Sequence, residues 1–363
     1  MAAKWKSLSW MVKSFYSLNR TLSLYHSQKS SLVRYNYNDL YTQLKRNYKY
    51  ILDEKLAAKI AKRLEPLRDE SIVVTNPGTG VLVKALLKAG ASHVIGLEPE
   101  RKFHLSLTDL KSELPEGERF EILHGDFSKI DPHLMKKDVC IPPAISSEDV
   151  LRSVKPQPWE SDHLAARFIG IEAAVNPDVV HRNLLRHLGA IAAKNGIFHK
   201  GRSELAFFFA EDRAHKITAQ FGSKYYNRQS IMLEMFCDVN ILLREPCSMF
   251  YPVQRKEKDS FLTLVSIIPK KKPSVDIARE DLEYLNYFIR LLLVKPKSKV
   301  LDVMETISPG SHTIFDELEF ADDLTVRDLC TEQISQLASA FFHWRGRSLN
   351  FFYDVGSHEV RTK

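Results

Sequence analysis

The chain has 363 residues, 44% of them hydrophobic, which predicts a sizeable core shared between two domains. Its apolar windows Ile231–Leu243 and Phe261–Ile268 are too short or too polar to span a bilayer, so a membrane-spanning protein is excluded. The net charge of +7 is poor evidence for nucleic-acid binding, because residues 1–38 hold six basic residues and no acid while the remainder is balanced.

The first 38 residues indicate the cellular compartment. They contain eight serines and no acid, and Trp5, Leu8, Val12 and Phe15 recur at a helical period opposite the lysines, as in an amphipathic mitochondrial transit peptide. The four cysteines lie far apart without a C-x-x-C pair, which argues against a zinc site and a disulfide framework and suits a reducing compartment. We therefore interpret residues 1–38 as a transit peptide into the mitochondrial matrix; a basic tail on a cytosolic protein is the alternative.

From residue 48 onward the pattern alternates between helices and short apolar strands. Apolar residues at Ile51, Leu56, Ile60 and Leu64 predict an amphipathic helix that leads into the first strand. Strict alternation of this kind predicts an α/β fold with a parallel, doubly wound sheet buried on both faces. The expected strands are Ile72–Thr75, Val94–Leu97 and Glu121–Leu123, and the expected helices are 48–64, Val81–Ala89 and Lys102–Leu110.

The middle of the chain is less regular, and its last part is helical. Asp138–Ile141 has the composition of a strand, whereas prolines and serines predict a loop over 145–160. Helical spacing dominates from residue 276, so we expect a helical C-terminal domain at 276–363, joined by Lys270–Lys272 to a domain that spans 39–270. The remaining expected elements are strands at 164–171, 205–210 and 261–268 and a helix at 178–193.

The stretch TNPGTG after the first strand predicts a ligand-binding turn. Gly78 and Gly80, between a strand and a helix, let the backbone approach a ligand and present amide groups to it. Glu98 ends the second strand, where a carboxylate can accept from ribose hydroxyls, and Asp126 follows the third, where it can accept from an adenine amine. The structural alternatives are a tight turn, a helix start and a cap. Val83 replaces the third glycine of a dinucleotide motif, which favours S-adenosylmethionine over NAD.

A resemblance to a known family rests on five segments: TNPGTGVLVKALLKAGA, VIGLEPE, HGDFSKIDP, IPPAISS and VKPQPW. Together they resemble the mitochondrial transcription factor B branch of the rRNA adenine dimethyltransferase family, and most closely its second paralogue. The likeness covers residues 45–345 and is strongest over 72–170. It implies a Rossmann-like S-adenosylmethionine methyltransferase sheet followed by a small helical C-terminal domain.

The resemblance also implies which residues hold the cofactor. Glu98 would bind its ribose, Asp126 its adenine, and Gly78 with Gly80 its methionine end. Two departures from the family pattern, Val74 in place of an acid and Asn76 in place of the first glycine, predict weakened binding of S-adenosylmethionine. Where the family has a Phe-Leu pair near the cofactor, this chain has Ile51 and Leu52.

The family's catalytic motif, Asn-Leu-Pro-Tyr, has no intact counterpart. In the family, amide and carbonyl oxygens accept from the target amine, and the ring stacks on the flipped base. Two registers are open, Ile171-Glu172-Ala173-Ala174 after an apolar run and Ile141-Pro142-Pro143-Ala144 by distance from Asp126, and we prefer the first. Glu172 could accept from the amine, although a solvated loop carboxylate is the simpler interpretation. We expect methyl transfer to be lost or strongly reduced.

The resemblance supplies a role that needs no methyl transfer. The second paralogue works with mitochondrial RNA polymerase to melt promoters and start transcription, so we expect an initiation factor of the mitochondrial nucleoid that contacts promoter DNA through phosphates and unpaired bases. An active S-adenosylmethionine-dependent dimethyltransferase of mitochondrial small-subunit rRNA is the alternative. A catalytically silent RNA-binding assembly factor of the mitochondrial ribosome is a third hypothesis.

Three short segments are candidates for nucleic-acid contacts. HRNLLRH places cations one helical turn apart, HKGR places them in a glycine turn, and SKYYNR interleaves them with aromatic rings that can stack on bases. A solvated helix face and core tyrosines are the alternative for each. The predicted contact residues are Arg182, Arg186, Lys200, Arg202, Lys224, Tyr226 and Arg228.

Overall fold

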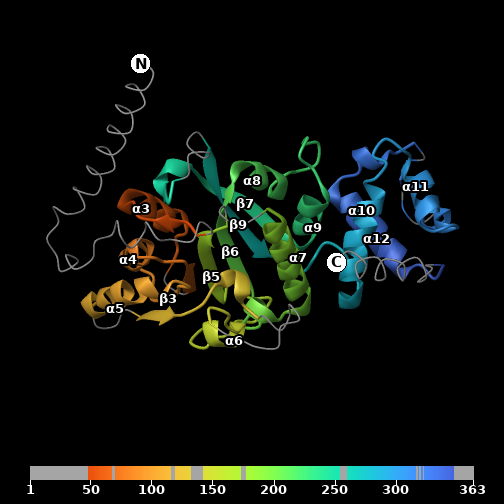
Figure 1. Ribbon diagram of the computed structural model, residues 1–363. Coiled ribbons are helices and arrows are strands. Elements are labelled where there is room, and N and C mark those ends of the chain that lie inside the picture. Colours follow the sequence, from red (N-terminus) through yellow and green to blue (C-terminus); the bar gives the residue numbers. More distant parts are fainter. Residues whose placement is uncertain are drawn as a thin grey trace, which may run out of the picture. The chain divides into compact units, whose positions relative to one another are not determined.

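Figure 1 presents the computed structural model of the protein. The structure describes residues 48–67, 70–115, 119–131, 142–172, 177–253, 260–315, 318, 320–321 and 323–346. The predicted transit peptide at 1–38 and the predicted strand at Asp138–Ile141 lie outside these residues.

A seven-stranded sheet forms the centre of the fold, with strand order β4-β3-β2-β5-β6-β9-β7. Strands β4, β3, β2, β5 and β6 are parallel, as predicted. The apolar runs of β2, β3, β5 and β6 are buried because helices cover a parallel sheet, whereas β4 at its edge is mostly half-buried. The strands are β2 (Ser71–Thr75), β3 (His93–Leu97), β4 (Arg119–Leu123), β5 (Ala166–Ile171), β6 (Ser203–Ala210), β7 (Cys237–Pro246) and β9 (Phe261–Pro269).

The last two strands correct the expectation of an all-parallel sheet. Strand β9 pairs antiparallel with both β6 and β7. Between β7 and β9 the chain makes no crossover helix among its described residues, and strands joined without one pair antiparallel. Several residues of β7 are exposed, as expected of a strand at the edge of the sheet.

The described helices match most predictions, with two corrections: the first predicted helix starts later, and a predicted loop contains a short helix. The first predicted helix starts only at Glu54, because the Asp53 side chain caps it by accepting from Leu56 N at 2.7 Å, and Tyr50–Ile51 form strand β1, paired with β8 (Phe250–Tyr251). The predicted loop at 145–160 contains helix α6 (Ser147–Val150). The other helices are α3 (Glu54–Arg63), α4 (Val81–Lys88), α5 (His104–Glu113), α7 (Pro177–Ala193), α8 (Glu211–Ile217), α9 (Arg228–Phe236), α10 (Leu282–Leu292), α11 (Val300–Ile307) and α12 (Thr331–His343).

The C-terminal helices share one hydrophobic core with the sheet. Buried residues of β2, β5, α9, α10 and α12 form a single cluster. Within it, Phe288 stacks on Phe341 with ring centres 4.9 Å apart. The predicted linker Lys270–Lys272 is held in place, since Lys270 N donates to Phe236 O and Trp159 Nε1 donates to Lys271 O. A separate domain at 276–363 stays a prediction. None of the described helices is long and apolar enough to cross a membrane.

Candidate functional site

The three predicted cofactor positions lie at the carboxyl ends of neighbouring strands. The glycine turn follows β2, Glu98 follows β3 and Asp126 follows β4, and these strands are adjacent and parallel, so their ends meet at one edge of the sheet. The contact is direct, because Glu98 Oε2 accepts a hydrogen bond of 2.9 Å from Gly78 N. The sequence therefore placed these residues together correctly.

Glu98 is completely enclosed at this edge. Its side chain is 0% exposed, and Oε1 accepts a second hydrogen bond, of 2.8 Å, from Glu100 N. Burial raises the pKa of Glu98 to about 8, although the two backbone N–H groups favour its charged form. Both oxygens of the carboxyl group are thus bound to its own backbone.

The backbone conformation and close packing of the glycine turn explain the presence of both glycines. Asn76, Gly78 and Gly80 have φ angles of 52°, 58° and 85°, in the left-handed region that favours glycine. A Cβ atom on Gly80 would lie 2.5 Å from Leu110 Cδ2, so Gly80 allows helix α5 to pack closely against the start of α4. The amide of Gly80 donates to Pro77 O at 2.9 Å. A tight turn is present whether or not a ligand binds there.

Asp126 is engaged by its own chain. Its Oδ2 accepts a hydrogen bond of 2.7 Å from the Tyr48 hydroxyl, and its Oδ1 accepts from Ser128 N at 3.0 Å and from Ser128 Oγ at 2.7 Å. Burial, followed by the charge of Asp126, raises the pKa of Tyr48. Asp126 therefore does cap the turn that follows it, and a tyrosine binds one oxygen of the carboxylate that was predicted to accept from adenine.

The segment that carries Tyr48 also carries the two predicted residues Ile51 and Leu52. Pairing of β1 with β8 places Ile51 opposite Phe250, where its side chain is 7% exposed, and Leu52 is half-buried. The strand brings this segment to the edge of the site from a position 78 residues away from Asp126 in sequence. The sequence analysis did not identify Tyr48 as a residue of the site; the two tyrosines of YKYIL were the feature that could have indicated it.

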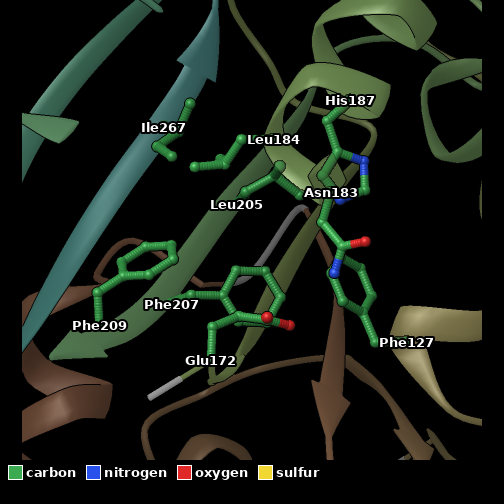
Figure 2. A pocket seen from close by; sticks show the side chains of 9 residues that line it. All are labelled: Phe127, Glu172, Asn183, Leu184, His187, Leu205, Phe207, Phe209 and Ile267. Atoms are coloured by element: carbon green, nitrogen blue, oxygen red, sulfur yellow. The ribbon is translucent and has the colours of Figure 1, made fainter. Parts of the chain in front are cut away.

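A small cavity with mostly apolar lining residues lies beside the end of β5 (Figure 2). It has a volume of about 20 Å³, enough for roughly one water molecule, and Asn183 and His187 project towards it from α7. Three polar atoms on its wall are buried without a hydrogen-bond partner among the described residues: Glu172 Oε2, Asn183 Nδ2 and His187 Nε2. Glu172 as a residue is half-buried, but its Oε2 atom is buried, which argues against a fully solvated carboxylate.

The charges around this cavity are strongly perturbed. Burial raises the pKa of Glu172 to about 7, with a further contribution from Asp126, while Arg186 opposes the shift. Burial, together with Arg186, lowers the pKa of His187 to about 3, so its ring is neutral. Glu172 can accept or release a proton near neutral pH, which is the property of a general acid or base.

Both registers of the catalytic motif reach this neighbourhood. Glu172 continues directly from β5, with its backbone N donating to Phe208 O at 2.9 Å, and Pro143 O accepts from Asp126 N at 2.8 Å. Residues 141, 173 and 174 lie outside the described residues. Neither Asn183 nor His187 was predicted to line a cavity. Their i, i+4 spacing, with a leucine directly after each, was the signal that they share a buried helix face.

The predicted nucleic-acid contacts separate into different environments. Arg202 is 7% exposed and its guanidinium donates to the carbonyl oxygens of Trp159, Ser161 and Pro269, so it holds the fold together and is not available to a ligand. Arg186 Nη1 donates to Ile130 O at 3.4 Å. The positions of the others are as follows: Arg182 and Lys224 are exposed, Lys200 is half-buried, and Lys224, Tyr226 and Arg228 line one cleft.

Comparison with proteins of known sequence places these features in a family. The profile of the family described as "Ribosomal RNA adenine dimethylase" matches residues 41–342. "Dimethyladenosine transferase 1, mitochondrial" of Vermamoeba vermiformis is 24% identical over 84% of this chain and 91% of its own length. "Dimethyladenosine transferase 2, mitochondrial" of Bos taurus is 25% identical over 87% of this chain and 82% of its own length. First and second paralogues thus match about equally well.

Solved structures confirm the predicted methyltransferase fold. The 23S rRNA methyltransferase ErmE aligns with a TM-score of 0.50 at 16% identity, covering 80% of this chain and 98% of that one. A dimethyladenosine transferase from Plasmodium falciparum aligns with a TM-score of 0.50 at 14% identity, covering 79% and 95%. Because the family profile extends from before α3 into α12, across the sheet and the C-terminal helices alike, the chain belongs to the ribosomal RNA adenine dimethylase family.

Proposed function

We propose that the protein is a mitochondrial transcription initiation factor, built on the scaffold of an rRNA adenine dimethyltransferase and acting with mitochondrial RNA polymerase to melt promoter DNA. The observation that supports the proposal most is the occupied cofactor edge, where Asp126 is bound by Tyr48 and Ser128 and Glu98 is enclosed by backbone. The absence of an Asn-Leu-Pro-Tyr motif points the same way. The mitochondrial names of the relatives and the acid-free segment 1–38 support a place in the matrix nucleoid.

The layout of the edge nevertheless fits a nucleoside. Glu98 and Asp126, at the ends of adjacent strands, suit the ribose and the adenine of S-adenosylmethionine, and the turn at Gly78 suits its methionine end. When bound, this cofactor supplies an electrophilic methyl group. Each carboxyl group must first give up hydrogen bonds to its own chain, so we propose that binding is weak.

The function is tested by run-off transcription with the cognate mitochondrial RNA polymerase on a linear promoter template. We expect specific transcripts on duplex DNA only when the protein is added. A template whose start site is already unpaired should need the protein far less, since melting is then complete. Equal transcription from the duplex with and without the protein would overturn the proposal.

Replacing Tyr48 by phenylalanine is expected to tighten the binding of S-adenosylmethionine by about tenfold, because a hydrogen bond to a charged acceptor that competes with the ligand is removed. Isothermal titration calorimetry measures the effect. Tyr225→Phe, which removes a hydroxyl group from a different part of the molecule, is the control and should leave affinity unchanged. Equal affinities for the wild type and Tyr48→Phe would show that Tyr48 does not obstruct the site.

A second candidate function, methylation of adenine in mitochondrial small-subunit rRNA, is favoured by Glu172. Its carboxyl oxygen Oε2 has no partner among the described residues and its pKa of about 7 suits acceptance of a proton from an amine. Methyl transfer from labelled cofactor to a small-subunit rRNA hairpin, measured on the same sample as transcription, separates the two functions. Methylated rRNA without promoter-dependent transcription would favour the enzyme.

A further inference from the structure

A cleft of about 400 Å³ opens between α8 and the start of α9, away from the cavity at Glu172. One lining residue, Tyr226, contacts the C-terminal helix α12, since its hydroxyl group is hydrogen-bonded to Thr331 Oγ1 at 2.8 Å. The volume lies in the range of small-ligand sites. The described residues that line it are Arg213, Lys216, Lys224, Tyr225, Tyr226, Asn227, Arg228 and Gln229.

The charges that line this cleft, hereafter the α8–α9 cleft, favour the binding of an anion. It has four cationic lining residues and no acid among those described, and none of Lys216, Lys224 and Arg228 forms an ion pair with a described residue. Gln229 is 5% exposed, and its Nε2 is buried without a hydrogen-bond partner among the residues that the structure describes. Because Gln229 Oε1 accepts from Arg213 Nη1 at 3.4 Å, the amide is oriented with its donor group left over.

Aromatic rings lie among these cations. Tyr225 stacks on His215 with ring centres 5.2 Å apart and an interplanar angle of 6°, and Lys224 Nζ lies 4.8 Å from the Tyr225 ring centre. Phe221 packs edge-on against Tyr226, with ring centres 5.9 Å apart, and is 47% exposed. An exposed ring beside unpaired cations provides a stacking surface as well as charge.

We propose that the α8–α9 cleft binds one segment of single-stranded nucleic acid, with phosphates on Lys216, Lys224 and Arg228 and a base stacked on Phe221. An unpaired strand fits because its bases have free faces, whereas the stacked bases of a duplex do not. The inference rests on the proposed function and deepens it, by naming where a strand released by melting is held. The chemistry is shared by DNA and RNA, which the test distinguishes.

The test measures fluorescence anisotropy of labelled single strands of about ten nucleotides, one DNA and one RNA, with the full-length protein. We expect Lys224→Glu to weaken binding by about tenfold at low salt and to reduce the slope of log affinity against log salt by about 0.7. Lys84→Glu, the same charge change at an exposed position of α4, is the matched control and should have little effect. Equal effects of the two substitutions on single-strand binding would contradict the proposal that the strand binds in the α8–α9 cleft.

The stacking part of the proposal has its own pair of variants. Phe221→Ala is expected to weaken single-strand binding by about fivefold or more, whereas Leu105→Ala, which removes an apolar side chain that is 56% exposed on α5, should not. Binding of a poly-glutamate peptide as tight as that of the oligonucleotides would indicate an acidic protein partner and overturn the assignment.

Transcription assays separate failure of the cleft from failure of the function. If Lys224→Glu and Phe221→Ala bind single strands like the wild type while the wild type still stimulates run-off transcription, the cleft is wrong and the function stands. If the wild type binds single strands through the cleft but does not stimulate transcription, the proposed function is wrong and the site stands.

Discussion

Replacing Glu172 by glutamine is expected to raise the free energy of unfolding at about pH 8 by ~3 kcal/mol and to leave it nearly unchanged at about pH 4. Burial raises the pKa of Glu172 from 4.5 to about 7, so the folded protein keeps a proton that the unfolded chain loses at lower pH. The stabilisation from this group is complete below the unfolded pKa and is lost as the pH rises through about 7. Glutamine stays neutral and avoids that loss.

Urea unfolding at a series of pH values measures this effect. The stability of Glu172→Gln should still fall as the pH rises through about 8, because burial also raises the pKa of Glu98. Glu283→Gln, at an exposed position of α10, is the control and should follow the wild-type curve. A Glu172→Gln curve that coincides with the wild type would mean that the carboxyl group is solvated when folded.

The same variant also bears on function. A buried carboxyl oxygen without a hydrogen-bond partner lowers stability. Proteins often keep such destabilising groups where they take part in binding or catalysis. If the protein methylates rRNA, Glu172→Gln should abolish methyl transfer while it stabilises the fold. If the protein acts only in transcription, stimulation of run-off transcription should survive the substitution.

Replacing Arg167 by methionine is expected to lower the free energy of unfolding by about 3–5 kcal/mol. Arg167 lies in β5, and its guanidinium contacts Glu70, Glu204 and the carbonyl oxygen of Leu64. The side chain of Glu204 is only 4% exposed. Removal of the cation would leave this carboxylate buried, with the hydroxyl of Ser266 as its remaining described partner.

Thermal and urea unfolding of matched variants measure the effect. Arg152→Met removes an ion pair with Asp149 in which the arginine side chain is 79% exposed, and should cost less than about 1 kcal/mol. Adding Glu204→Gln to Arg167→Met should restore part of the lost stability, since the more deeply buried of the two carboxylates that lose their cation is then neutral. Equal losses in Arg167→Met and Arg152→Met would contradict the assignment of a buried cluster.

Particular elements show how far local pattern reaches in this fold. Strands β2, β3, β5 and β6 were predictable because central parallel strands are short apolar runs bounded by turns. The antiparallel pairing of β7 and β9 was not, since direction depends on the route between strands rather than on their composition. Strand β1 was mistaken for helix because a buried Tyr-Ile pair fits either period over so short a stretch.

The candidate site divides in the same way. Gly78, Glu98 and Asp126 were recognisable because each directly follows a predicted strand, and parallel strands bring their ends to one edge. Glu172 was expected in solvent, and His187 was not expected in a cavity at all, because burial depends on what covers a residue from elsewhere in the chain. Arg202 looked like a surface cation for the same reason.

The sequence was enough to predict the α/β class, to place Gly78, Glu98 and Asp126 after neighbouring strands and to show that an Asn-Leu-Pro-Tyr motif is absent, since strand patterns and motifs are local. The contact of Tyr48 with Asp126, the burial that raises the pKa of Glu172 and the cationic cleft between α8 and α9 became visible only in the folded chain. These properties arise from contacts and desolvation between segments far apart in the chain, which no local pattern encodes.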